Sequence, residues 1–369
     1  MIETFNMRCP HFLVYGLFVL ALLSCKKDGA TVLPEISFDL PADVNLVYGK
    51  HDTINLNTFI VNQGNGVNFS VGFEPTENVQ ITPQITLHNQ LEKAIFIDKS
   101  GKLFIKSEEL YPNGTTSSLN GKKIPAQYSV TVSAKSTDGK EVAQKLLSIR
   151  VLELEDLRFK YFDDLKKGQL KIFNILYADT DSYFTLTKPV PSKNLIIKLT
   201  EAQAKEVGLS LQDTALKIYW KGNANQEHDK YMELNPKLEK DGFAIGSASF
   251  SIRYIPKIEF FFGELYLDPS TQSIKKLSTS FRRSSVEGGS AVQPTFFPEK
   301  LISSFEISSI EKDGHIFSDT EMVFTIDKGT GMVSVKNNTS LKAGIYTLTL
   351  QANTSNGQKV ITTLSLGLE

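Results

Sequence analysis

The chain has 369 residues with 40 basic and 41 acidic side chains, a balance that excludes the strongly basic composition of nucleic-acid-binding proteins. Its 24 Phe and 12 Tyr favour strands, and its 14 Pro and 24 Gly are too few for a disordered or collagen-like chain. Length and composition therefore predict two or three mainly β domains, each with its own core.

The first 24 residues have the pattern of a signal peptide. Arg8 precedes an apolar run from Phe12 to Leu23, which as a helix would rise only about 18 Å, too short for a hydrocarbon core of about 30 Å. Small Ser24 and then Cys25 follow, where a signal peptide would be cut. We therefore expect residues 1–24 to be removed and residues 25–35 to form a tether.

Leu22-Leu23-Ser24-Cys25 resembles the lipobox of bacterial lipoproteins. The resemblance implies that Cys25 is lipidated, and acyl chains anchor a protein because each buried CH₂ adds about 0.8 kcal/mol. The alternative is an ordinary secretory signal that leaves a free thiol. The cysteine count favours the lipobox, because Cys9 and Cys25 are the two cysteines of the sequence and the mature chain would then have no disulfide.

Lys26-Lys27-Asp28-Gly29 follows the cysteine and resembles the short charged export signal of surface lipoproteins of the Bacteroidota. The resemblance implies a lipid-anchored protein of the outer membrane that faces the cell exterior. An anchor in the periplasmic leaflet is the alternative. The expected partners are the membrane, through the N-terminal lipid, and neighbouring outer-membrane proteins.

Two stretches far apart in the chain share a hairpin pattern. Residues 95–106 and 323–336 each contain a β-pattern, an Asp-Lys turn closed by Gly101 or Gly331, and a second alternating strand. Glycine supplies the positive φ that such turns need. A second matched pair follows each stretch, namely residues 128–134 with Asp138-Gly139 and residues 346–352 with Asn356-Gly357. The repeat predicts two related β-sandwich units, residues 36–154 and 298–369.

The C-terminal copy resembles a cadherin-like repeat, which implies an immunoglobulin-like or cadherin-like sandwich. The resemblance is carried by Phe324, Ile326, Asp327, Thr330, Gly331, Leu341, Gly344, Tyr346, Leu348 and Ala352. Asp98 and Asp327 are interpreted as turn formers, because the calcium motifs of that family, such as Asp-x-Asn-Asp, are missing here. No metal and no cofactor are expected.

Residues 155–297 between the two units predict a different, mostly β central domain. A short helix is expected after Thr200, where Thr-Glu-Ala-Gln has the spacing of a capping box. Ser270 to Gln293 is rich in Ser, Gly, Lys and Arg, which predicts a mobile loop or linker.

The sequence contains no recognisable catalytic motif. Its five histidines have no His-Glu-x-x-His spacing, and it has neither a Gly-x-Ser-x-Gly elbow nor a phosphate-binding glycine loop. We therefore expect that the protein is not an enzyme. Catalysis ranks third, after the two binding functions described below.

The densest mixture of rings and hydrogen-bonding side chains runs from Tyr219 to Tyr231 and includes Trp220 and Asn223. Aromatic rings can stack on the C–H faces of sugars, while amides and charges can bond the hydroxyls. These four residues are therefore the candidate ligand-binding set. The alternative places Trp220 in the core, because Trp is usually largely buried.

The overall plan, with a lipid anchor, a sandwich spacer, a variable middle domain and a terminal β-unit, resembles the surface glycan-binding lipoproteins of glycan-foraging Bacteroidota. The resemblance implies a non-catalytic protein that binds polysaccharide. The main alternative is a structural or adhesive module that contacts protein partners through sheet edges.

The anchor gives the first testable expectation. Replacing Cys25 by Ala removes the residue that would carry the lipid, so Cys25→Ala protein should move from the membrane to the soluble fraction. Metabolic labelling with palmitate, followed by fractionation, measures this directly. Label retained on the Cys25→Ala protein would contradict the lipobox interpretation.

Overall fold

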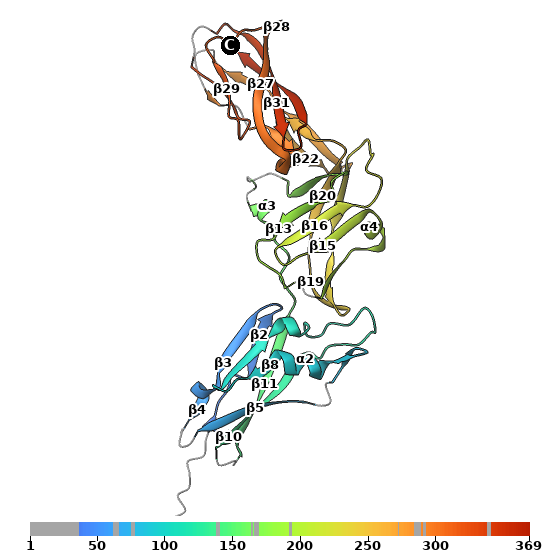
Figure 1. The fold of residues 1–369 in the computed structure, drawn as a ribbon, viewed down its shortest axis with the longest axis vertical. Helices are drawn as coiled ribbons and strands as arrows, with labels where there is room; N and C mark the ends of the chain where they lie inside the picture. Colours follow the sequence, from blue (N-terminus) through green and yellow to red (C-terminus); the bar gives the residue numbers. More distant parts are fainter. Residues whose placement is uncertain are drawn as a thin grey trace, which may run out of the picture.

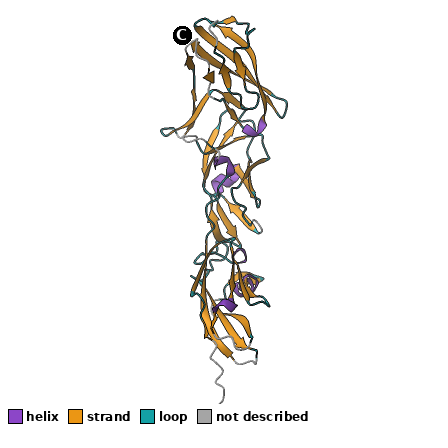
Figure 2. Cartoon of the chain, turned by 90° about the vertical axis from the view of Figure 1, so that its left-hand side faces the viewer, coloured by secondary structure: helices purple, strands orange, loops and turns teal. Residues whose placement is uncertain are grey.

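The computed structural model describes residues 37–61, 66–74, 78–137, 141–163, 165, 170–191, 194–271, 273–283, 289–290, 293–337 and 341–369. The predicted signal peptide, tether and Cys25 lie outside the described residues. The described part forms β units that follow one another along the long axis, with the C-terminus at the end opposite β4 (Ile60–Val61) (Figure 1). Strands run through all of it and helices are short (Figure 2). Among the described residues, no helix combines the length and apolarity that crossing a membrane requires.

The first unit is a two-sheet sandwich, as predicted. One sheet has the order β2-β11-β10-β5 and the other the order β3-β9-β8, and β2 lies parallel to β11. Its strands are β1 (Ser37–Phe38), β2 (Asp43–Val47), β3 (His51–Asn55), β4 (Ile60–Val61), β5 (Val67–Phe73), β6 (Gln80–Thr82), β7 (Ile85–Thr86), β8 (Ile95–Ile97), β9 (Lys102–Lys106), β10 (Tyr128–Ser136) and β11 (Glu141–Leu152). Its helices are η1 (Leu56–Phe59), α2 (Leu87–Ala94) and η3 (Ser107–Glu109).

Helix α2 was not predicted from the sequence. Thr86 begins the helix with a complete capping box, in which its side chain accepts from the Asn89 N–H. Leu87, Leu91 and Ala94 then lie on one buried face at helical spacing. Its eight residues are too few to show several turns of helical periodicity in the sequence.

The third unit repeats the topology of the first. Its sheets have the orders β24-β32-β31-β27-β28 and β25-β30-β29, with β24 parallel to β32. The elements are β21 (Glu259–Phe261), β22 (Gly263–Asp268), β23 (Ser273–Ser278), β24 (Phe281–Arg283), β25 (Gly289–Ser290), β26 (Thr295–Phe297), η4 (Glu299–Leu301), β27 (Ile302–Lys312), β28 (His315–Ile316), β29 (Phe324–Ile326), β30 (Val333–Val335), β31 (Gly344–Thr354) and β32 (Lys359–Leu368). The predicted repeat of hairpins is therefore confirmed.

The two repeated turns are closed in the same way. Asp98 and Asp327 each accept hydrogen bonds from two backbone N–H groups of their own turn, at 2.7–3.0 Å. These bonds hold the pKa of both carboxyl groups below the usual range. Gly101 and Gly331 follow with φ of 78° and 71°, as the sequence predicted.

The stretch from Ser270 to Gln293, predicted to be a mobile loop or linker, contains strands in its described part, and residues 272, 284–288 and 291–292 lie outside the described residues. β22 and β23 form a hairpin there, and β24 and β25 pair with β32 and β30 of the third unit. The backbone N–H and C=O groups of a strand can bond to neighbouring strands whatever its side chains are. The polar composition of this stretch therefore gave no indication of the pairing.

The central unit has the same topology, although the sequence predicted a different domain. β12 lies parallel to β20, β13-β16-β15 forms the smaller sheet, and β14 pairs with β18. Pro236 separates β17 from β18, which otherwise form one bent strand opposite β19 and β20. The elements are α3 (Lys160–Asp163), β12 (Ile172–Leu176), β13 (Ser182–Thr185), β14 (Leu195–Lys198), α4 (Glu201–Glu206), β15 (Val207–Leu211), β16 (Ala215–Trp220), β17 (Lys230–Leu234), β18 (Lys237–Lys240), β19 (Phe243–Ser247) and β20 (Phe250–Ile255).

The short helix α4 of the central unit occupies the same place in the topology as α2 of the first unit. α4 leads directly into β15 as α2 leads into β8, and Thr200 accepts from the Gln203 N–H as Thr86 does from Asn89. The helix expected after Thr200 is thus confirmed. The described residues form three sandwiches of one topology.

A buried contact joins the first unit to the central one. The Tyr111 hydroxyl, on a fully buried side chain, donates to Asp241 Oδ2 at 2.6 Å. Lys240 Nζ, also buried, donates to the Glu108 carbonyl at 2.6 Å and lies 5.0 Å from the Tyr111 ring centroid. A buried polar group left unpaired costs about 1–3 kcal/mol, so these bonds hold the two units in one arrangement.

The repeated turns generate a stability prediction. Gly331→Ala would place a Cβ 2.7 Å from Pro294 Cγ and 3.1 Å from the Phe305 ring, whereas Gly357 has positive φ with nothing within 4 Å. Gly357→Ala should therefore cost about 1 kcal/mol from backbone strain alone, and Gly331→Ala should cost more. Urea unfolding of both variants measures the difference, and equal losses would contradict the close packing at Gly331.

Candidate functional site

Trp220, the ring favoured by the sequence, is half-buried at the end of β16. Its ring centroid lies 5.1 Å from that of Tyr177 and 4.9 Å from that of Tyr254, both of which are buried. Lys230 Nζ lies 5.5 Å from the indole, and a Cβ on Gly222 would approach the indole to 2.8 Å. Burial raises the pKa of both tyrosines. The indole is therefore packed against neighbours on several sides.

Of the remaining predicted residues, Asn223 contacts Trp220, and Tyr231 lies on the other sheet. Asn223 lies in the exposed loop after β16, and its carbonyl accepts from Trp220 Nε1 at 3.1 Å. Tyr231 lies on β17 of the opposite sheet, where its hydroxyl meets Glu233 and Ser251. Trp220 and Asn223 are therefore in contact, whereas Tyr231 belongs to the other sheet of the central unit.

Tyr219 is half-buried on the outer face of β16. It pairs with Gly208 on the edge strand β15, and a Cβ on Gly208 would lie 2.1–2.4 Å from three atoms of the Tyr219 ring. The ring therefore lies flat over the glycine on the outer face of the sheet. One ring face is covered by the backbone of Gly208, and the Lys217 ammonium also lies over the ring.

Tyr183 and Lys217 share this outer face with Tyr219. Tyr183 on β13 pairs with Lys217 on β16 and is 48% exposed. Lys217 Nζ lies 5.5 Å from the Tyr183 ring centroid and 5.6 Å from that of Tyr219, so the ammonium stands between the two rings. We call Tyr183, Lys217 and Tyr219 the ring platform.

The charge of the ring platform is balanced by one carboxylate. Lys217 Nζ donates to Asp181 Oδ1 at 2.7 Å. This hydrogen bond raises the pKa of Lys217 above its usual value. The platform thus presents two rings, a set of donors and a set of acceptors at nearly zero net charge.

Sequence reasoning missed Tyr183 and Lys217, although a signal for them was present. Buried Ser182, Leu216 and Ile218 alternate with the less buried Tyr183, Lys217 and Tyr219, as in strands with one covered face. The alternation places Tyr183 and Lys217 on the outer face of their strands, but only the pairing of β13 with β16 brings these two residues together.

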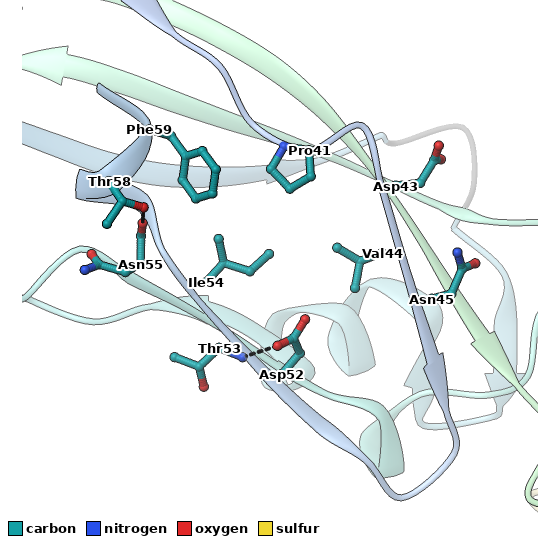
Figure 3. A pocket seen from close by; sticks show the side chains of 10 residues that line it. All are labelled: Pro41, Asp43, Val44, Asn45, Asp52, Thr53, Ile54, Asn55, Thr58 and Phe59. Carbon is teal, nitrogen blue, oxygen red and sulfur yellow. Dashed lines mark hydrogen bonds between the residues drawn. The ribbon is translucent and has the colours of Figure 1, made fainter. Parts of the chain in front are cut away.

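A shallow groove of about 540 Å³ lies elsewhere, on the first unit, between β2 and β3 (Figure 3). Its floor is apolar and its walls carry two carboxylates. The lining residues are Pro41, Asp43, Val44, Asn45, Asp52, Thr53, Ile54, Asn55, Thr58 and Phe59. Within the described ranges, no group of three or more His, Cys, Asp or Glu side chains could hold a metal ion.

Neither a protein-family model nor a curated protein matches the chain. Solved structures match at low similarity. The protocadherin GammaB4 extracellular domain is 14% identical with a TM-score of 0.23, over 90% of this chain and 49% of that one. A SusE-like surface-located polysaccharide-binding protein from the Bacteroides thetaiotaomicron heparin utilisation locus is 13% identical with a TM-score of 0.20, over 91% of this chain and 60% of that one.

A third match is SGBP-B of the Bacteroides ovatus mixed-linkage glucan utilization locus, solved with a mixed-linkage heptasaccharide. It is 11% identical with a TM-score of 0.20, over 90% of this chain and 70% of that one. The chain thus spans about half of the protocadherin and less than two thirds of the SusE-like protein. TM-scores this low establish neither a family nor a function for the chain.

The packing of Trp220 generates a stability prediction. Trp220→Ala should destabilise the central unit by about 3 kcal/mol, the lower end of the range for removing a packed Trp, because its contacts with Tyr177 and Tyr254 are lost. Trp220→Phe keeps a ring and should lose less. Chemical unfolding of both variants measures the costs. A loss below about 1 kcal/mol in the Ala variant would show that the ring does not support the fold.

Proposed function

We propose that the protein is a non-catalytic, lipid-anchored cell-surface protein of the outer membrane that binds glycan on the ring platform of its central unit. The observation that carries the proposal is the arrangement of Tyr183, Lys217 and Tyr219 on one open sheet face. A flat, open face suits a ligand that is longer than the site.

The chemistry of the platform matches that of a sugar chain. A ring that lies flat offers a π-face to the C–H face of a sugar, and Tyr219 lies flat because Gly208 has no side chain. Lys217 and Asp181 can donate to and accept from neighbouring hydroxyls. Because the two charges neutralise each other, a neutral sugar is favoured over a charged one.

The elongated arrangement of the units supports display away from a membrane. The chain's N-terminal unit and its C-terminus lie at opposite ends of the long axis (Figure 1). A lipid on Cys25 would hold the N-terminal end at the bilayer, and the first unit would then serve as a spacer. The ring platform lies beyond that spacer.

Adhesion to protein partners is the second candidate function. It is favoured by the exposed apolar side chains of the third unit, where Ile316 is 92% exposed, Met322 69% and Ile345 58%. Exposed apolar side chains can mark a protein-binding surface. Ile316 and Ile345 lie on the outer face of the sheet that contains β28, β27 and β31.

The chain offers a matched pair of tyrosines for the test. Tyr183 on the ring platform and Tyr266 on β22 are both 48% exposed. Tyr183→Ala should weaken binding to a soluble neutral polysaccharide roughly 5- to 150-fold, taking about 1–3 kcal/mol for a stacking ring from base stacking. Tyr266→Ala should leave binding unchanged.

Affinity electrophoresis of the soluble chain from Lys26 to Glu369, in gels that contain neutral or acidic polysaccharides, measures these affinities. Circular dichroism of both variants checks that the fold is intact. Equal affinities for the Tyr183→Ala and Tyr266→Ala proteins would reject the platform as the binding site. Binding to no polysaccharide at all would favour the adhesive function.

A further inference from the structure

We propose that the groove between β2 and β3 of the first unit binds an extended peptide segment of a partner protein, one in which aromatic residues alternate with Lys or Arg. This interaction is independent of the ring platform. It rests on three features of the groove, namely its free strand edges, its filled counterpart in the central unit and its charge.

The groove runs along two free strand edges. β2 is the edge of one sheet and β3 is the edge of the other. Consecutive residues of each strand line the groove, 43–45 and 52–55, although consecutive side chains of a strand point to opposite faces. A groove lined in this way follows the edge itself, where alternate backbone N–H and C=O groups have no strand partner. Two of these groups on β3 have local partners, because the Thr53 N–H donates to Asp52 Oδ1 at 2.8 Å and the Asn55 carbonyl accepts from Thr58 Oγ1 at 2.7 Å. Such an edge can pair with an added strand.

The central unit shows what fills the equivalent opening. There the chain's own segment around α3 lies at β12 and β13, the counterparts of β2 and β3. Phe159 forms an antiparallel bridge with Leu186, directly after β13. The Phe162 ring stacks at 4.4 Å from that of Phe173 on β12. Phe159 thus lies in an extended position beside the end of β13, whereas Phe162 lies on the short helix α3, and both rings fill the space between these two strands of the fold.

In the first unit the same opening is covered in part. β1 pairs with β4 after β3, and Phe38 is buried there as Phe159 is in the central unit. The groove, with Val44 and Ile54 in its floor, remains at the position where the central unit has Phe162. An aromatic side chain from a partner can occupy it.

The negative charge of the groove favours basic residues next to the aromatic residue of the partner peptide. Asp43 and Asp52 line it, and none of its lining residues is Lys or Arg. The segment that fills the central opening has Arg158 before Phe159 and Lys160 after it. A peptide of this composition would complement both the apolar floor and the two carboxylates.

The chain supplies the probe for the experiment. A capped, fluorescent peptide of residues 157–163, Leu-Arg-Phe-Lys-Tyr-Phe-Asp, is added to the soluble chain from Lys26 to Glu369, and anisotropy measures binding. The double variant Asp43→Lys and Asp52→Lys should weaken binding at least tenfold at low salt. Each single variant, Asp43→Lys or Asp52→Lys, should also weaken binding, whereas Glu92→Lys, the same change of charge at an exposed site on α2 of the same unit, should leave it unchanged.

Two altered peptides separate the contributions of rings and backbone. Replacing Phe159 and Phe162 by Ala in the peptide should weaken binding at least tenfold. Two further peptides are N-methylated, one at the odd-numbered and one at the even-numbered residues. One of them should lose binding and the other should keep it, because an added strand bonds its partner through the N–H groups of alternate residues. Equal binding of both methylated peptides would overturn strand pairing.

Other outcomes would also overturn the proposal. They are no binding at about 1 mM peptide, equal binding to the charge-reversed and native proteins, and displacement of the peptide by a soluble polysaccharide. The last outcome would make the groove a glycan site. Failure of the ring-platform variants to affect glycan binding would leave the peptide result unaffected, so the two proposals fail separately.

Discussion

The contact between Tyr111 and the turn after β18 is the constraint on which the arrangement of the first two units depends. Lys240 is buried there although it carries a positive charge, and burial lowers its pKa. Its bond to the Glu108 carbonyl and its position over the Tyr111 ring compensate for lost hydration. The stretch after β9, which the third unit lacks, thus serves the junction. Through it the ring platform keeps a fixed orientation to the first unit.

A second buried ion cluster lies where the central unit meets the third. Arg253 on β20 is 2% exposed, and it bonds Asp229 at 2.6 Å and Glu259 at 2.8 Å. Lys276 of β23 bonds the same Glu259 at 2.7 Å. A buried charge without its partner is strongly destabilising, so β21 and β23 must stay against the outer face of the central sheet. Both junctions therefore use polar groups that are satisfied only when the units are in contact.

The sequence predicted the mainly β class, the repeated hairpins and the positive φ of Gly101 and Gly331, because these follow from local patterns. It did not reveal that the central unit repeats the same topology. Pro236 divides one strand there, and the pairing of β12 with β20 is between residues about eighty apart, beyond local pattern. The ring platform shows the same limit. Tyr219 was identified from composition, whereas Tyr183 joins it only through strand pairing.

The central claim is that glycan binds on the outer face of the sheet β13-β16-β15. The most direct measurement is the structure of the protein with a bound neutral oligosaccharide, or shift mapping by nuclear magnetic resonance with the same ligand. The account predicts contacts with Tyr183, Lys217 and Tyr219, and unchanged surroundings for Trp220. Contacts confined to the groove of the first unit, or to the third unit, would contradict it.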